Sequence, residues 1–524
     1  MSDSDSASGS VSSSAPGSSG KILLDVKGLS FSHPGGPKVF DNLDLSVSSG
    51  ETVVIMGGSG VGKTTLAELI FNLKDQSDYA GKIKLKKRAA ALVLQEGAVF
   101  EHLTVGGNLV MVLRRHGISR DKATIKNSLD EVGLGSIEVR RRTATLSGGQ
   151  KRRLALARAL CSEPKLLYCD EPSAGLDLDS VLELGRLIRK VVRRKDRAAV
   201  VVTHDPLLAA LTGDRVLLME KGRLTELVSW PDSPDELSDG EITGRTKTVE
   251  DAAKGRLTQG ISDQRTAKKG KARETLARFS PLKIGDYAIG TLQSIISLPS
   301  SLYHIRDFAT VFTRAFRLSG TSGVPFFLLV GGILGATFIM ILLGASILPA
   351  RITLEKVGAV PLTAIAPPLA GFLFASRSGS AISSWLGSMG HSRQVDALRS
   401  LRVSPDSYLR APCWLAMILA FFLASIALFT AMWAGAWIMV TYNVGIADAS
   451  SYLRPFINSQ ITFHAKVKIP LYAVLCASIT THVGLRPKKT AEDVARGTTH
   501  VIIVGTVLVV LVELLFAAFL AAGG

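Results

Sequence analysis

The stretch from Gly57 to Thr65 has the residue types and spacing of a phosphate-binding loop. Apolar runs precede it at 52–56 and follow it at 66–70, and it reads Gly57-Gly58-Ser59-Gly60-Val61-Gly62-Lys63-Thr64-Thr65. This order predicts a strand, a glycine-rich turn and a helix, whose backbone N–H groups point at the phosphates of a nucleotide. We expect all nine residues to contact the nucleotide, with Lys63 at the β- and γ-phosphates and the Thr64 hydroxyl on Mg²⁺.

Four more polar residues that suit phosphoanhydride hydrolysis each follow an apolar, strand-like run. They are Gln95, Asp170, Glu171 and His204. Asp170 suits Mg²⁺ ligation, and Glu171 suits polarising the attacking water. Gln95 can hydrogen-bond a water on the metal, and His204 is expected to complete the catalytic set. A lone histidine at a strand end is usually a packed or surface residue, but here it closes an ordered series.

A second anion site is expected where a serine and two glycines open a helix. The segment reads Leu146-Ser147-Gly148-Gly149-Gln150 and precedes a helical run at 151–160. A helix N-terminus with exposed N–H groups and a hydroxyl favours negative charge. Further on, Asp177 ends the segment Ser173-Ala174-Gly175-Leu176-Asp177.

This ordered series resembles the ABC ATPase family over residues 21–228. The matching motifs are Walker A at 57–64, the Q-loop at Gln95, the signature at 146–150, Walker B at 166–171, the D-loop ending at Asp177 and the switch histidine His204. The resemblance implies an α/β P-loop NTPase fold with ATP and Mg²⁺ as cofactors. It also implies that an aromatic ring lies under adenine, where His33 falls, with Phe31 nearby.

In that family two cassettes enclose two ATP molecules, each between one P-loop and the signature of the other cassette. The resemblance therefore implies that Ser147, Gly148, Gly149 and Gln150 contact the nucleotide bound by a second cassette. Because this chain has one P-loop and one signature, we expect a homodimer.

Apolar residues are spread unevenly along the 524-residue chain. The first part alternates as a soluble α/β domain does, whereas runs of membrane-spanning length follow near 324–348, 357–376, 411–441, 468–484 and 499–521. We therefore expect an all-α membrane domain with about five transmembrane helices, preceded by an interfacial helix near 282–304. The net charge is +17, and the basic residues of the second half lie in loops beside the spans. This placement favours a membrane surface over nucleic acid as the partner.

Composition also predicts the domain boundaries. Residues 1–20 are rich in Ser and Gly and are expected to be a disordered tail. The ATP-binding domain is expected at 21–228, a charged linker at 229–275 and the membrane domain at 276–524.

The second half resembles the MlaE-type permease family of lipid-transport ABC systems. The resemblance covers about 280–521 and is strongest at 372–412, where small residues from Phe374 to Ala381 precede the segment Gln394-Val395-Asp396-Ala397-Leu398. It implies an inner-membrane permease that works with a periplasmic MCE-type lipid-binding partner and a small cytoplasmic accessory subunit. The family's Glu-Leu-Gly-Pro step reads Ala364-Ile365-Ala366-Pro367 here, so the carboxylate is absent. Cassette and permease, usually separate chains, are fused.

We therefore expect an ATP-driven, homodimeric half-transporter that moves phospholipid or a similar hydrophobic molecule. Because ATP and Mg²⁺ are in the cytosol, we expect the cassette there, and five spans then place the C-terminus in the periplasm. The basic residues of the inner loops agree with the positive-inside rule. Two alternatives stay open at this point. One is a stand-alone exporter of hydrophobic solutes or drugs that resembles the cassette-first ABCG arrangement, and the other is a membrane ATPase that transmits force to an external partner without transport.

Overall fold

The computed structural model divides the chain into two compact units, Met1–Lys269 and Gly270–Gly524. The predicted tail at 1–20 lies outside the residues that the structure describes. The described residues are 21–33, 35–58, 60–73, 79–85, 90–95, 98–193, 197–230, 234, 236–257, 284–345, 349, 352–354, 365–444, 459–488 and 490–522.

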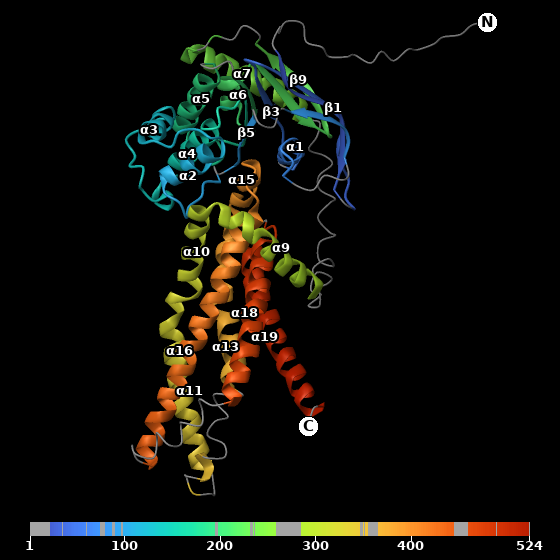
Figure 1. Ribbon diagram of the computed structural model, residues 1–524. Helices are drawn as coiled ribbons and strands as arrows, with labels where there is room; N and C mark the ends of the chain where they lie inside the picture. Colours follow the sequence, from blue (N-terminus) through green and yellow to red (C-terminus); the bar gives the residue numbers. More distant parts are fainter. Residues whose placement is uncertain are drawn as a thin grey trace, which may run out of the picture. The chain divides into compact units, whose positions relative to one another are not determined.

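The first unit is built on a six-stranded sheet (Figure 1). All of its neighbouring strands pair in parallel except the last two. Its central strands are short apolar runs that are buried on both faces, which is typical of parallel sheets covered by helices. The strand order is β5 (Ala90–Val93), β6 (Leu166–Asp170), β7 (Ala198–Val202), β3 (Thr52–Met56), β8 (Arg215–Glu220) and β9 (Arg223–Ser229).

A separate antiparallel sheet completes the strands of this unit. Its order is β2 (Lys38–Ser48), β1 (Ile22–Ser32) and β4 (Tyr79–Leu85). The helices are α1 (Lys63–Ile70), α2 (Val105–Arg115), α3 (Lys122–Asp130), the 3₁₀ turn η2 (Thr143–Thr145), α4 (Gly148–Leu160), α5 (Leu178–Arg193), α6 (Pro206–Thr212) and α7 (Asp239–Leu257).

Helix α7 lies inside the range expected to be a charged linker. Its residues Ile242, Val249 and Ala253 are buried, and the helix packs against α6 and β9. The three residues share one face of the helix because they are seven and four positions apart. The prolines and acids just before this helix are typical of a linker, but the apolar spacing within it is typical of a packed helix. Part of 229–275 is therefore packed structure.

The second unit is all α-helical in the part that the structure describes. Its helices are α9 (Ile284–Tyr303), α10 (Ile305–Ser319), η4 (Thr321–Gly323), α11 (Val324–Ala345), α13 (Ala366–Phe374), the π-helical turn η6 (Ala375–Gly379), α14 (Ser380–His391), α15 (Gln394–Ser400), the π-helical turn η7 (Asp406–Arg410), α16 (Ala411–Val444), α18 (Ser459–Leu485) and α19 (Ala491–Ala522).

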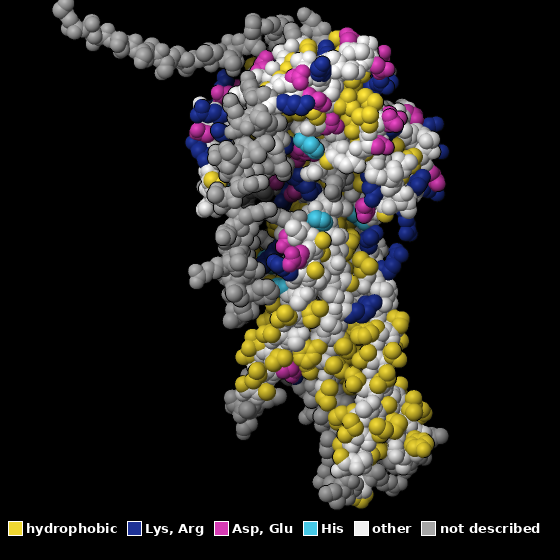
Figure 2. Space-filling view, turned by 180° about the vertical axis from the view of Figure 1, so that it is seen from behind, with side chains coloured by type: hydrophobic (Ala, Val, Ile, Leu, Met, Phe, Trp, Pro, Cys, Tyr) yellow, Lys and Arg dark blue, Asp and Glu magenta, His cyan; other side chains and the backbone are white. Residues whose placement is uncertain are grey.

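Among the described residues, four helical stretches are long and apolar enough to cross a bilayer. They are Ile305–Ala345, Asp406–Asn443, Val467–Leu485 and Ala491–Ala518. They overlap four of the five predicted spans. The other, 357–376, begins outside the described residues, continues through α13 and ends in η6. Hydrophobic side chains cover much of the face of this unit seen in Figure 2.

Helices α11 and α16 pack with their backbones in contact. A Cβ on Gly335 would stand 2.0 Å from the carbonyl oxygen of Met432, and a Cβ on Gly435 would stand 2.1 Å from that of Gly332. Small residues allow such close approach between membrane helices. Glycine is therefore required on both sides of this helix pair.

Candidate nucleotide-binding site

The phosphate-binding loop leaves the buried strand β3 and enters α1 at Lys63. Gly62 has a φ of +110°, a conformation that favours glycine. A Cβ at this position would also lie 2.8 Å from Cγ1 of Val39 and 2.9 Å from Cε1 of Phe40, both on β2. The loop is thus pressed against the antiparallel sheet, and Gly62 is needed for its conformation and for space. Ser59 lies outside the described residues.

Lys63 is held inside this loop. Its Nζ donates to the carbonyl oxygens of Gly57, at 2.7 Å, and of Gly58, at 3.0 Å. The same ammonium lies 3.4 Å from Oε1 of Glu171, and Lys63 is 8% exposed. The P-loop lysine and the Walker B glutamate, 108 positions apart by number, are therefore brought together by the parallel sheet.

Glu171 also contacts the switch histidine. Its Oε2 lies 2.7 Å from Nδ1 of His204, and its backbone N–H donates to the carbonyl of Val202 at 2.8 Å. Glu171 has a φ of +49°, which is uncommon for a residue other than glycine. The backbone turn directly after β6 directs the carboxylate toward both Lys63 and His204. Such strain at a polar residue is typical of functional sites.

Oxygen donors suited to Mg²⁺ come from the neighbouring elements. Asp170 ends β6 and is fully buried, Thr64 lies in the first turn of α1, and Gln95 follows β5, the strand paired with β6. Carboxylate, hydroxyl and amide oxygens are hard ligands, and Mg²⁺ usually completes its shell with water and substrate phosphates. Among the described residues no three His, Cys, Asp or Glu side chains gather as a metal site. The donor set therefore fits a metal held together with nucleotide phosphates.

The signature segment forms an exposed helix start. The Ser147 hydroxyl accepts from the N–H of Gln150 at 3.2 Å, and the Gln150 side chain accepts from the N–H of Ser147 at 3.1 Å. This reciprocal cap fixes the first turn of α4. No atom lies within 4 Å of where a Cβ on Gly148 or Gly149 would stand. Helices α1 and α4 lie apart within this unit (Figure 1), so the signature at the start of α4 is separated from the P-loop that leads into α1.

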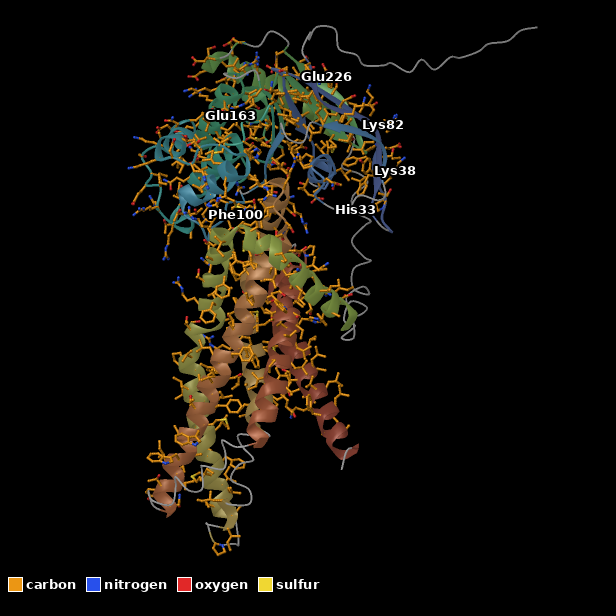
Figure 3. The ribbon with its side chains drawn as sticks, in the orientation of Figure 1. His33, Lys38, Lys82, Phe100, Glu163 and Glu226 are labelled. Carbon is orange, nitrogen blue, oxygen red and sulfur yellow. The ribbon has the colours of Figure 1, made fainter. Side chains whose placement is uncertain are left out.

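The two remaining predicted residues lie at the edges of the unit. His33 is exposed just beyond the end of β1, and its ring is edge-on to that of Phe31, with 5.1 Å between centroids (Figure 3). Its role under adenine stays a prediction. Asp177 caps α5, because its Oδ1 accepts from the N–H of Ser180 at 3.1 Å. Hydrogen bonds from the side chain and the N–H of Ser180 lower the pKa of the Asp177 carboxyl.

Asn108, which no motif includes, is a buried hub between the Q-loop and the signature. Its side chain accepts from the N–H of Phe100 at 2.9 Å, and donates to the carbonyls of Phe100 and Thr104 and to the hydroxyl of Thr143, each at 3.1 Å. Asn108 is 0% exposed. It therefore joins the segment that follows Gln95 to the turn that precedes Ser147. An asparagine inside an otherwise apolar helical run is the sequence signal that could have found it.

Arg158 makes a second link between the same segments. It lies on the signature helix α4, and its Nη1 donates to the carbonyl of Ala98 at 3.0 Å. Its guanidinium also stands 4.7 Å from the centre of the Phe100 ring. Complete burial lowers the pKa of Arg158 to about 10. A movement of the segment after Gln95 would therefore be transmitted to α4.

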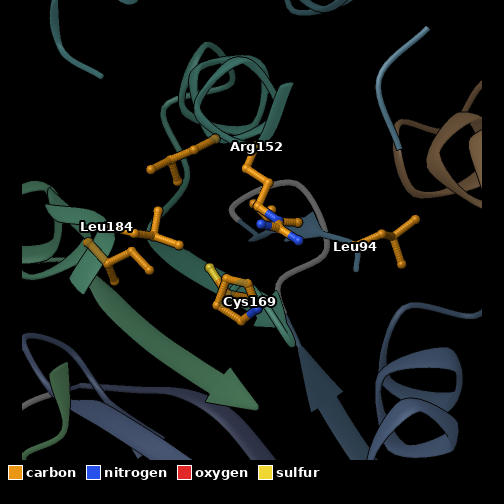
Figure 4. A pocket seen from close by; sticks show the side chains of 8 residues that line it. Leu94, Arg152, Cys169 and Leu184 are labelled. Carbon is orange, nitrogen blue, oxygen red and sulfur yellow. The ribbon is translucent and has the colours of Figure 1, made fainter. Parts of the chain in front are cut away.

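A pocket lies behind the Walker B strand, and its lining is mostly apolar. Figure 4 shows Leu94, Arg152, Cys169 and Leu184 around it, and Val93, Leu156, Pro172 and Ile188 complete the lining. Burial raises the pKa of the Cys169 thiol to about 12, so this cysteine is not a reactive thiolate. The pocket belongs to the core that supports Asp170 and Glu171.

Comparison with protein families agrees with the motif order. The family described as ABC transporter matches residues 40–174, and the family described as Permease MlaE matches residues 312–519. Both resemblances expected from the sequence, and the fold class, are thereby confirmed.

Individual relatives match the first half. A sulfate/thiosulfate import ATP-binding protein CysA of Mesorhizobium japonicum is 38% identical over 200 residues, which are 36% of this chain and 58% of that protein. An Fe(3+) ions import ATP-binding protein FbpC 1 of Haemophilus influenzae is 31% identical over 238 residues, 43% of this chain and 71% of that protein. The chain spans only 58% to 62% of the length of the first curated relatives.

Among solved structures, cbiO1 from Clostridium perfringens, described as part of the ABC transporter complex cbiONQ, is similar with 25% identity and a TM-score of 0.37. That similarity covers 45% of this chain and 96% of that one. From the motif order, the site geometry and the two family matches together, the chain belongs to the ABC transporter family and carries its ATP-binding cassette and an MlaE-type permease in one polypeptide.

Proposed function

We propose that this chain is an ATP-driven transporter that moves phospholipid or a similar hydrophobic molecule across or between membranes. The observation that carries the proposal is the fusion of a cassette with a complete set of ATPase motifs to a permease of the MlaE type. The names of the relatives describe import ATPases of other substrates, and they match only the cassette. The substrate class is therefore inferred from the permease half.

In this proposal the P-loop backbone from Gly57 to Thr65 binds the ATP phosphates, and Lys63 exchanges its carbonyl partners for phosphate oxygens. Mg²⁺ would be held by Thr64 and Asp170, with Gln95 on a metal-bound water, and would neutralise phosphate charge. Glu171 orients and polarises the attacking water, and His204 holds the Glu171 carboxylate in place. The 2.7 Å contact between His204 and Glu171 supports these roles.

We propose that the working form is a homodimer. The separation of α1 from α4 within one cassette supports this, because a signature can reach a nucleotide only on a second copy. The open space over Gly148 and Gly149 would admit that nucleotide's γ-phosphate. An isologous dimer of a single chain then supplies two complete sites.

We place the protein in the inner membrane, with the cassette cytoplasmic and the C-terminus periplasmic. Arg377, Arg393, Arg399, Arg402 and Arg410 lie between two predicted spans, and the positive-inside rule puts such a segment in the cytoplasm. We also propose a periplasmic MCE-type lipid-binding protein and a small cytoplasmic accessory subunit as partners, because the permease half is of the MlaE type.

The test is mass spectrometry of what co-purifies with the full-length Glu171→Gln protein in mild detergent. This variant should bind ATP without turning over and so retain its cargo, and Glu226→Gln, on an exposed strand, is the matched control. We expect phospholipid enriched over the bulk membrane profile, together with a periplasmic lipid-binding protein. A bulk lipid profile with no partner would contradict the proposal and favour a stand-alone exporter of hydrophobic solutes.

A further inference from the structure

Two charged side chains face each other between two helices in the apolar part of the second unit. Across 324–345, 411–443, 467–485 and 497–518, Lys468 and Glu513 are the only Lys, Arg, Asp or Glu residues. They lie on different helices, α18 and α19, and Nζ of Lys468 is 2.6 Å from Oε2 of Glu513. Two otherwise uncharged helical segments thus each contribute one charged residue to a single ion pair.

A third polar group and an aromatic ring complete the cluster. The hydroxyl of Tyr472, one turn after Lys468 on α18, donates to Oε1 of Glu513. Nζ of Lys468 also lies 5.2 Å from the centre of the Phe516 ring, a cation–π distance. Both carboxylate oxygens and the ammonium therefore have partners within the cluster.

The members of the cluster differ in exposure. The Lys468 side chain is 5% exposed and Tyr472 is 0% exposed, whereas the Glu513 side chain is 27% exposed. Glu513 is therefore the group that an incoming molecule meets first, with the ammonium and the hydroxyl behind it. Lys468 is in the first turn of its span and Glu513 is near the end of its span, so both lie toward the end of the unit that the proposed topology puts outside.

Holding α18 against α19 does not require this ion pair. Ile479 and Val483 of α18 form an apolar cluster with Val501, Val504 and Leu508 of α19. Buried ion pairs cost desolvation, and apolar residues of similar size often replace them without loss of stability. Ionisable residues inside a membrane protein therefore mark a functional site more often than a structural one.

We propose that Lys468, Tyr472 and Glu513 bind the headgroup of a zwitterionic amphiphile that carries both a phosphate and a primary amine. This inference rests on the proposed phospholipid transport and narrows its substrate. The amine, met first, pairs with Glu513, and the phosphate takes over Lys468 and the Tyr472 hydroxyl. Lys468 thus exchanges the Glu513 carboxylate for the negative phosphate, and Glu513 exchanges the Lys468 ammonium for the positive amine. Every charge is still paired with an opposite charge.

The test compares headgroups with identical acyl chains. Full-length protein is reconstituted in vesicles of equal parts phosphatidylethanolamine and phosphatidylglycerol and extracted in mild detergent, and its bound lipids are quantified by mass spectrometry. For wild type we expect the amount of bound phosphatidylethanolamine to exceed that of bound phosphatidylglycerol by about tenfold, because only phosphatidylethanolamine has an amine that can pair with Glu513. Glu492→Gln, an exposed change on the same helix, should keep this ratio.

Two variants separate headgroup binding from helix packing. Lys468→Met combined with Glu513→Leu keeps the volume without the charges and should bring the ratio to that of the vesicle. Glu513→Gln leaves Lys468 as a lone cation, so the preference should turn toward phosphatidylglycerol. A single gel-filtration peak and unchanged basal ATPase activity show that each variant is folded.

The outcomes distinguish failure of the headgroup site from failure of the proposed phospholipid transport. A double variant that keeps the wild-type ratio, or wild type that binds both lipids equally, would show that the pair only joins the helices and would overturn the inference alone. Wild type that retains neither lipid would remove the lipid-transport proposal itself, and the headgroup site with it.

Discussion

Glu171 and His204 meet just beyond the ends of two adjacent parallel strands, with 2.7 Å between Oε2 of Glu171 and Nδ1 of His204. Asp170 on β6 pairs with Val202 on β7, so Glu171, one residue beyond β6, and His204, two residues beyond β7, both lie at the carboxyl ends of these strands. The ammonium of Lys63 approaches the other carboxylate oxygen at 3.4 Å. One carboxylate thus links Lys63 of the phosphate-binding loop to the switch histidine His204.

Glu171→Gln should abolish turnover while ATP still binds. The amide keeps the shape of the side chain but cannot polarise water as a base, and general base catalysis contributes about 10²–10⁴-fold. We would measure phosphate release and nucleotide binding on the same preparation, with Glu226→Gln as control. Sustained hydrolysis would disprove the assignment of the base.

Lys63→Ala should lose nucleotide affinity. Hydrogen bonds to charged groups contribute about 1.5–3 kcal/mol, so the dissociation constant for ATP should rise by roughly 10- to 150-fold. Calorimetry checks this, and Lys82→Ala on the exposed strand β4 is the control for loss of one positive charge. Equal affinity in the two variants would contradict the role of the loop.

Asn108→Ala should destabilise the cassette, because the buried N–H of Phe100 loses the Asn108 oxygen as acceptor, and the carbonyls of Phe100 and Thr104 each lose one of their two hydrogen bonds. Loss of the acceptor for the buried N–H alone costs about 1–3 kcal/mol. The melting temperature of the full-length protein is the measurement, and Asn127→Ala, exposed on α3, is the control. A melting temperature equal to that of the control would show that the hub is dispensable.

The cap of α3 should make a pH-dependent contribution to stability. The N–H of Thr124 donates to Asp121, and this bond, with others from Thr124 and Ser119, lowers the pKa of the Asp121 carboxyl below 3.8. A carboxyl whose folded pKa is depressed stabilises the fold above its unfolded pKa, and the stabilisation is lost as the pH falls through the folded value. Asp121→Asn keeps a capping oxygen without the charge. The gap in melting temperature between wild type and variant should therefore be constant above about pH 5 and should shrink as the pH falls below the unfolded pKa of about 3.9. A gap that stays constant down to about pH 3 would contradict the assignment.

Gly335→Ala should separate α11 from α16, because the added methyl would stand 2.0 Å from the Met432 carbonyl. Overpacking of this kind costs about 1–3 kcal/mol. Gly344→Ala on the same helix is the matched control, since no atom lies within 4 Å of its Cβ position. Thermal stability in detergent should fall for the first variant only, and equal stability would mean that the helices are not in backbone contact.

The cassette was largely predictable because its chemistry depends on short segments at strand ends. A parallel sheet brings those ends to one edge whatever lies between them, so Lys63, Glu171 and His204 could be grouped from the sequence. Asn108 and Arg158 do not lie at strand ends, so this rule does not group them; most of their hydrogen-bond partners are backbone groups, and the asparagine within an apolar helical run is the sequence signal that points to Asn108. Lys468 and Glu513 were missed because a pair between two helices depends on their relative rotation, which hydropathy does not encode.

The glycine contact between α11 and α16 also limits how the permease can move. At these glycines no side chain separates the two backbones, so the helices cannot slide past each other without first losing that contact, and we expect them to move together. If the second unit opens, we therefore expect the movement between helices that pack through longer side chains, which can change rotamer. The interface between α18 and α19, where Lys468 pairs with Glu513, is of this kind.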